Sequence, residues 1–257
     1  MQGLIKGGWI SSLNDIPEPK ARLICFSHEG GSADFFKSWL QYIRADIELM
    51  IVQLPGRAER VDQPLMTDVD QVVSSLVESC QSILDKPYML FGHSLGAVLA
   101  FETVMKLSEM GLRLPKRLVI SGRQAPTDKG SYFQKMSQLD DQDFFEDLVN
   151  DDCLGQWVMS SPEEVSNALP YIRADFEMLE GYQPASTEPL NIPIDVFAGS
   201  RDAIPLGNLL EWQKVSRYPV HVCVFKGGHF FVEDDQISVL NHLNELFDEV
   251  IVSAAYA

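Results

Sequence analysis

The residues with the clearest chemical potential centre on Ser94, which stands between two glycines in the pattern Gly-x-Ser-x-Gly (Gly92–Gly96). An apolar run precedes the motif and a helix-compatible run follows it, so the sequence predicts a strand that turns sharply into a helix. The turn lifts the hydroxyl above the sheet and leaves the Leu95 amide at a helix N-terminus, where it faces any oxyanion that forms. We expect Ser94 to be a nucleophile; the alternative is a glycine-rich helix start without chemistry.

A serine hydroxyl is a weak nucleophile and needs a general base within hydrogen-bond reach. Of the five histidines, His229 is the expected base. It follows the last predicted strand in Lys226-Gly-Gly-His-Phe-Phe231, and the two glycines allow the loop to fold back toward Ser94. A structural role is the alternative for His229, and it is the ordinary interpretation of His221 and His242.

A third group must orient the imidazole and stabilise its cation. Asp202 comes directly after a predicted strand, in Gly199-Ser-Arg-Asp-Ala-Ile-Pro205, whereas Asp195 lies in the middle of that strand. The chain order Ser94, Asp202, His229 is the Ser…Asp…His order of the α/β-hydrolase fold. This order, together with the strand-end placement, predicts a Ser-His-Asp triad more specifically than any single motif does.

A second backbone donor for an oxyanion is expected in the turn after the first core strand, His28-Glu-Gly-Gly31. We expect the Glu29 amide to face the Leu95 amide and complete an oxyanion hole. Losing one such donor typically costs about 3 kcal/mol of transition-state stabilisation. The glycines also suit a plain strand-to-helix turn, and the two interpretations are compatible. The side chains expected to line the substrate pocket are those of His28, His93 and Phe230.

Alternating strands and helices must position these residues. Strands are expected at 22–27, 47–54, 88–92, 117–121, 192–198 and 220–225, and helices at 33–44, 68–84, 96–110, 206–215 and 237–252. This alternation predicts one α/β-hydrolase domain over residues 1–257, with a mostly parallel central sheet and helices on both faces.

One segment interrupts the alternation. Residues 125–184 are acidic, helix-like and rich in aromatic side chains, and we expect them to form a helical lid over the sheet edge. The alternative is that the aromatic residues pack a small core of the insertion itself. The α/β core then spans about 21–124 and 185–257, and residues 1–20, with two prolines, are expected to be an arm.

The composition limits the possible partners. The net charge of −17 argues against nucleic-acid binding, and 46% hydrophobic with 22% charged residues predicts an ordinary globular core. No signal peptide or membrane-spanning run is evident, so we expect a cytoplasmic protein without a membrane partner. The four cysteines show no metal-binding spacing, so no metal is expected, and Cys25 and Cys223 are interpreted as buried thiols.

The chain resembles the type II (external) thioesterases of nonribosomal peptide and polyketide biosynthesis over nearly all of its length after residue 20. The resemblance rests on the stretches 23–33, 52–57, 91–97, 169–176 and 227–231. Of these, Gln-Leu-Pro-Gly-Arg57 and Leu169-Pro-Tyr-Ile-Arg-Ala-Asp-Phe176 are not general hydrolase features. Two positions depart from the family pattern: Ser27 replaces a usual proline and Glu29 a small residue. A carboxylate at 29 would oppose an oxyanion if it pointed inward.

The resemblance implies an enzyme that hydrolyses acyl or aminoacyl thioesters on the phosphopantetheine arms of carrier proteins. It would remove wrong or stalled groups or release units, as a monomer without a cofactor of its own. Alternatives are a carboxylesterase or lipase with the same triad, and a non-catalytic hydrolase-fold protein that binds carrier proteins. A chain-releasing thioesterase is less expected, because such units usually end a large multidomain enzyme and this chain begins at Met1.

Overall fold

A seven-stranded sheet forms the centre of the computed structural model, which describes residues 8–127, 136–150 and 162–255. The strand order is β1-β3-β2-β4-β5-β6-β7, and every neighbouring pair is parallel except β1 with β3. The strands are β1 (Ile10–Ser12), β2 (Ala21–Phe26), β3 (Ile47–Val52), β4 (Tyr88–His93), β5 (Arg117–Ser121), β6 (Ile194–Gly199) and β7 (His221–Phe225). The mostly parallel sheet expected from the sequence is confirmed.

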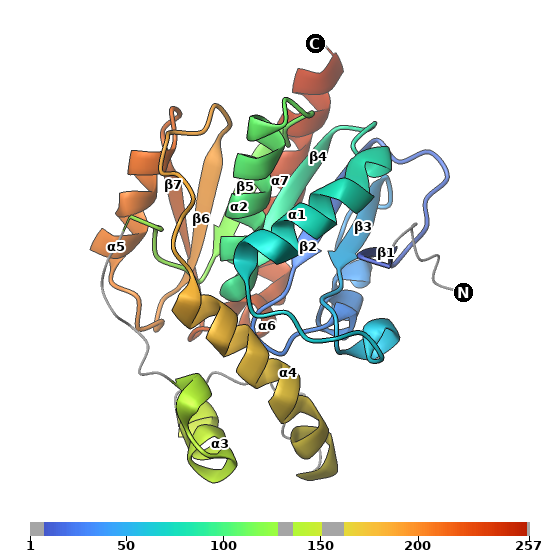
Figure 1. Cartoon of the computed structure of the whole chain (residues 1–257). Helices are drawn as coiled ribbons and strands as arrows, with labels where there is room; N and C mark the ends of the chain where they lie inside the picture. Colours follow the sequence, from blue (N-terminus) through green and yellow to red (C-terminus); the bar gives the residue numbers. More distant parts are fainter. Residues whose placement is uncertain (1–7, 128–135, 151–161, 256–257) are drawn as a thin grey trace.

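Helices cover both faces of this sheet. Figure 1 shows α1 and α2 in front of the strands and α7 behind them. The helices are η1 (Ala33–Gln41), η2 (Ala58–Arg60), α1 (Val69–Cys80), η3 (Gln81–Ile83), α2 (Leu95–Glu109), η4 (Met136–Gln138), α3 (Asp141–Asn150), α4 (Pro162–Gly181), α5 (Leu206–Leu210), η6 (Glu211–Val215), α6 (Phe231–Asp234) and α7 (Gln236–Ala255), with η denoting 3-10 helices. None of the described helices has the length and hydropathy to cross a membrane.

The buried faces follow from the sequence pattern. The central strands β2 and β4 read as nearly continuous apolar runs because helices cover both of their faces. α1 is amphipathic and begins at Asp68, whose carboxylate accepts a hydrogen bond from the Gln71 amide at 2.8 Å. α1, α2 and η6 pack on one face of the sheet, and η1 and α7 pack on the other.

Two expectations for the first fifty residues need correction. Residues 10–12 are not part of an arm, because they pair with β3 as the antiparallel edge strand β1, with Ile10 opposite Val52. A strand of three residues is too short to show the alternation of apolar and polar side chains by which strands are predicted. The guanidinium of Arg60 lies over the neighbouring Trp9 ring. The helix expected at 33–44 is the shorter 3-10 helix η1, in which residues three apart eclipse one another. Its buried Phe36 and Trp39 rings accordingly lie 4.9 Å apart.

The lid, here η4, α3 and α4, lies beyond the sheet at the edge where the parallel strands end (Figure 1). Its helices share a small apolar cluster in which the Phe144 and Phe176 rings contact each other edge to face at 5.7 Å. Part of the expected insertion, 128–135 and 151–161, lies outside the described residues.

Candidate active site

Ser94 occupies a strained turn between β4 and α2, with φ 54° and ψ −115°. The flanking glycines are required by close packing. A Cβ on Gly92 would lie 2.1 Å from the Gly96 carbonyl oxygen, and a Cβ on Gly96 would lie 2.2 Å from that of Phe26. The turn expected from the motif is therefore present, and it seats the serine directly against the end of β2.

The Ser94 hydroxyl donates a hydrogen bond to Glu29 Oε1 at 3.2 Å. Glu29 is buried, and its side chain points inward toward Ser94. An ionised carboxylate this close to the serine opposes any negative charge that develops on a substrate oxygen. The direction of the Glu29 side chain could not be predicted from the sequence; in the structure it points toward Ser94.

His229 and Asp202 meet at the same sheet edge. Nδ1 of His229 lies 3.1 Å from Oδ2 of Asp202, whose side chain is only 4% exposed. Asp202 follows β6 and His229 follows β7, as expected from the sequence. The loop after β5 is next to both histidines, because a Cβ on Gly122 would contact His93 Cε1 at 2.9 Å and His229 Cε1 at 3.1 Å.

Ser94 lies next to this histidine pair. Its amide donates to the Ser121 carbonyl at 2.9 Å, and Ser121 directly precedes Gly122. The His93 and His229 ring centroids are 5.0 Å apart. Among the described residues, no hydrogen bond joins the Ser94 hydroxyl to His229, because the hydroxyl is held by Glu29.

His28 and His93 lie in the apolar floor of the site rather than in solvent. His28 contacts the Phe35 ring at 4.7 Å and the Phe230 ring at 4.9 Å. Burial, and secondarily the neighbouring His229, lowers the pKa of His28 to about 3 and that of His93 well below its usual value. Both rings are therefore neutral at physiological pH, and the pocket-lining role expected for them and for Phe230 stays a prediction.

The His93 ring is anchored on one side only. Its Nδ1 lies 2.9 Å from the Ser121 hydroxyl. Within the described part of the chain, His93 Nε2 and both ring nitrogens of His28 have no hydrogen-bond partner.

The 28–31 loop carries the amide expected to complete the oxyanion hole. The Gly31 amide donates back to the His28 carbonyl at 2.9 Å, which closes the turn. Gly30 has φ 75°, a conformation that favours glycine, and its amide donates to Asp175 Oδ2 at 2.8 Å. In the described structure no hydrogen bond occupies the Glu29 amide or the Leu95 amide, and their role as an oxyanion hole stays a prediction.

Sequence reasoning missed the link between this loop and the lid. Asp175 of α4 pairs with Arg57, which follows β3, through two hydrogen bonds of 2.6 Å each. Both residues stand in the family-specific stretches, and Arg57 follows a strand end as Asp202 does. That placement was the available signal.

Other candidate groups lie away from the site. Asp195 pairs with Arg117 at 2.7 Å, and His229 pairs with Asp202 instead. Cys25 is fully buried as expected, and burial raises the pKa of its thiol. Cys223 is only half-buried, and its Sγ lies 3.2 Å from His242 Nε2. In the described residues, no three His, Cys, Asp or Glu side chains form a group that could hold a metal ion.

Comparison with known proteins identifies the family of the chain. The family model "Thioesterase domain" matches residues 21–247. Gramicidin S biosynthesis protein GrsT of Aneurinibacillus migulanus is 30% identical over 236 residues, covering 91% of this chain and 92% of that protein. The type II thioesterase BorB from the borrelidin biosynthetic cluster has a TM-score of 0.84 at 28% identity, covering 95% of this chain and 97% of that one.

A second solved structure has a similar match. YbtT, the type II thioesterase of the yersiniabactin NRPS/PKS pathway, has a TM-score of 0.81 at 28% identity, covering 95% of this chain and 99% of that one. The chain therefore belongs to the thioesterase family, and it is a hydrolase of thioesters with the α/β-hydrolase fold, similar to the type II enzymes of nonribosomal peptide and polyketide pathways.

Proposed function

We propose that this enzyme hydrolyses acyl and aminoacyl thioesters from the phosphopantetheine arms of carrier proteins, and that it removes wrong or stalled groups from a nonribosomal peptide or polyketide synthase. One observation carries the proposal. The strained Ser94 turn and the Asp202–His229 pair converge on one sheet edge, beneath a lid and beside two unpartnered backbone amides. The convergence favours acyl transfer through a serine nucleophile.

In the proposed first step, the Ser94 hydroxyl turns from Glu29 to His229. His229 takes the hydroxyl proton while Ser94 Oγ attacks the thioester carbonyl, and Asp202 stabilises the resulting imidazolium. The Glu29 and Leu95 amides donate to the oxyanion of the tetrahedral intermediate. The carbon–sulfur bond then breaks, and the thiolate takes up the proton held by His229.

In the second step, His229 removes a proton from water, and the hydroxide oxygen attacks the acyl-enzyme carbonyl. The ester bond to Ser94 breaks, its oxygen recovers the proton from His229, and a carboxylic acid is released. A thioester suits this site because a thiolate is a good leaving group, so acid assistance matters less than it does for an amide.

Mass spectrometry of carrier proteins provides the test. Carrier proteins loaded with different acyl and aminoacyl arms are incubated with the native enzyme and with Ser94→Ala. We expect the native enzyme to leave the free phosphopantetheine thiol and the variant to leave the arms loaded. Equal unloading by both would refute a Ser94 nucleophile.

The oxygen-ester alternative is decided by matched substrates. The native enzyme is given a carrier-bound thioester and an aryl ester of the same acyl group, and a strong preference for the ester would favour a carboxylesterase. A fluorophosphonate probe tests the non-catalytic alternative. Failure to label Ser94, while known serine hydrolases are labelled in parallel, would favour a binding protein.

A further inference from the structure

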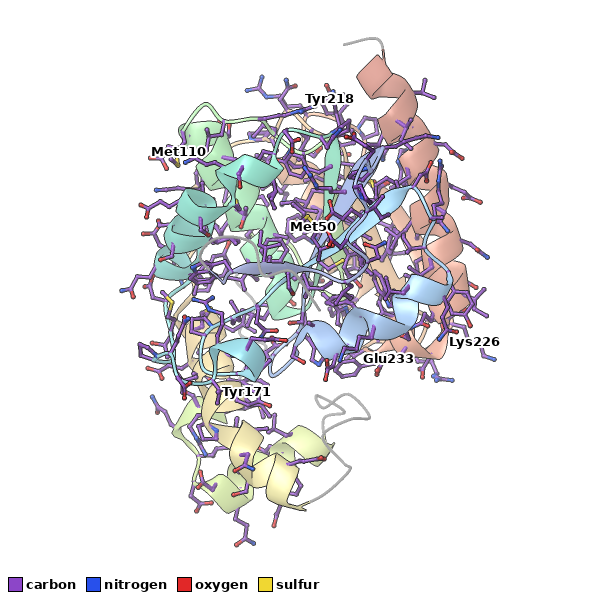
Figure 2. The ribbon with its side chains drawn as sticks, turned by 90° about the vertical axis from the view of Figure 1, so that its right-hand side faces the viewer. Met50, Met110, Tyr171, Tyr218, Lys226 and Glu233 are labelled. Carbon is purple, nitrogen blue, oxygen red and sulfur yellow. The ribbon has the colours of Figure 1, made fainter. Side chains whose placement is uncertain are left out.

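The Arg57–Asp175 pair is a deeply buried ion pair between the lid and the rest of the molecule. Its side chains are 3% and 1% exposed, and two parallel hydrogen bonds of 2.6 Å join them. The guanidinium also lies 4.7 Å from the centre of the Tyr171 ring, one turn earlier on α4. Figure 2 shows Tyr171 where the lid meets the body of the molecule. Such a two-pronged contact fixes orientation as well as distance.

Both members of the pair also hold the backbone of the 28–31 loop. Asp175 Oδ2 accepts the Gly30 amide at 2.8 Å, and Arg57 Nη1 donates to the Gly31 carbonyl at 3.4 Å. α4 presses on the same point, because a Cβ on Gly30 would lie 2.7 Å from Ile172 Cγ1. The loop is thus held from α4 and from the segment after β3, directly beside the Glu29 amide.

The Arg57–Asp175 pair carries no net charge, which matters because it lies beside the expected oxyanion hole. A lone carboxylate one residue from an oxyanion donor would oppose the negative charge of the intermediate. The Arg57 guanidinium cancels that charge while Asp175 keeps its grip on the Gly30 amide. The ion pair therefore holds the loop without destabilising the negative charge of the intermediate.

From these contacts we propose that Arg57 and Asp175 are positioning residues that set the direction of the Glu29 amide, so that the oxyanion hole is complete only while α4 is seated. The inference rests on the proposed role of that amide in the reaction. It assigns the function of the hole partly to the lid helix rather than to the α/β core alone.

The test is the Asp175→Asn variant, which keeps the side-chain shape and removes the charge. We expect kcat, normalised to titrated active sites, to fall at least about tenfold while KM stays within about twofold, because a displaced oxyanion donor weakens only the transition state. Labelling of Ser94 by a fluorophosphonate should slow by a similar factor, since the phosphonyl oxygen occupies the same hole. A merely structural role would change the folded fraction and leave both normalised rates unchanged.

Two matched controls separate positioning from general damage. Arg173→Gln alters the neighbouring arginine on α4, whose guanidinium bonds the Ser137 and Leu139 carbonyls within the lid. Asp195→Asn breaks a second buried ion pair, with Arg117, away from the site. Both controls should keep the native normalised rates. Losses in either control that match those of Asp175→Asn would overturn the proposal.

If Asp175→Asn does not fold, Arg57→Lys is measured instead, because it keeps the charge and loses the two-pronged contact. It should lower normalised kcat in the same direction, and native rates in this variant would overturn the proposal. Failure of the proposed function has a different signature, because the native enzyme itself would then neither label nor turn over. Native labelling with unchanged variant rates refutes the positioning role alone.

Discussion

Two buried arginine–aspartate pairs lie in different parts of this molecule, and they differ in what else they hold. Arg117 and Asp195 join β5 to β6, and Arg117 also bonds Glu249 of α7. Arg57 and Asp175 join the segment after β3 to α4, and they bond the 28–31 loop as well. The first pair ties a helix to the sheet. The second pair makes one further hydrogen bond from each member to the backbone of the loop that contains Glu29, whose side chain bonds Ser94.

Burial and short distances therefore do not by themselves reveal which ion pair matters for the chemistry. Removing the aspartate of either pair deprives an arginine of its buried counter-ion, so both pairs should contribute to stability. Only the loop-bound pair is expected to contribute to the rate as well. The predictions that follow test this division.

The largest expected effect comes from Ser94→Ala. Its residual rate is the lower limit with which the effects of the positioning residues are compared. Without the nucleophile, kcat should fall by roughly four orders of magnitude or more. Thermal unfolding should stay close to native, because neither ion pair is touched. Residual activity close to native would contradict the serine mechanism on which the comparison depends.

Asp195→Asn should lower the free energy of unfolding by about 3 kcal/mol, because Arg117 loses its buried partner. Denaturant titration measures this loss, and active-site titration normalises the rate. Since Asp195 is remote from Ser94, kcat per active site should stay native. A fall in that rate would break the distinction between the two pairs.

Glu29→Gln sharpens the comparison at the loop itself. It removes a carboxylate 3.2 Å from the Ser94 hydroxyl and leaves the backbone amide unchanged. Turnover of a neutral acyl thioester should rise about tenfold, equivalent to about 1.4 kcal/mol, because the oxyanion no longer meets a like charge. Steady-state kinetics with the same carrier-bound substrate provides the measurement. Slower turnover would indicate that the carboxylate assists the reaction.

The smallest effect concerns pH. The pKa of His28 is lowered to about 3 in the folded protein, so the unfolded chain binds a proton that the folded chain excludes. As the pH falls below about 6.5, stability should drop by up to about 1.4 kcal/mol per pH unit for this residue. His28→Gln should make the loss of unfolding free energy between pH 6 and pH 5 smaller by about 1 kcal/mol. An identical slope in both proteins would contradict the assigned burial.

Local patterns made much of the fold and site predictable. The turn around Ser94 and the strand-end positions of Asp202 and His229 each depend on a few neighbouring residues, and parallel strands bring their carboxyl ends to one edge. The sheet itself could be predicted for the same reason. The edge strand β1 could not, because Ile10–Ser12 is too short to show a period.

The remaining features depend on contacts between distant segments. Arg57 and Asp175 are separated by 118 positions, and nothing local in either stretch indicates its partner. The inward direction of the Glu29 side chain likewise follows from its surroundings rather than from its neighbours in sequence. These positions could be singled out from the sequence, but their contacts could not be predicted because they depend on tertiary packing.

The contact between Gly30 and Ile172 has a consequence for recombination among related enzymes. A chimaera that receives a foreign lid replaces the side chain opposite Gly30, where even an added Cβ on Gly30 would lie only 2.7 Å from Ile172 Cγ1. A graft of α4 that is meant to change substrate selectivity therefore has to include the 28–31 loop and Arg57 from the same donor enzyme. The segments that must be exchanged together therefore extend beyond the insertion, because they include two parts of the α/β core.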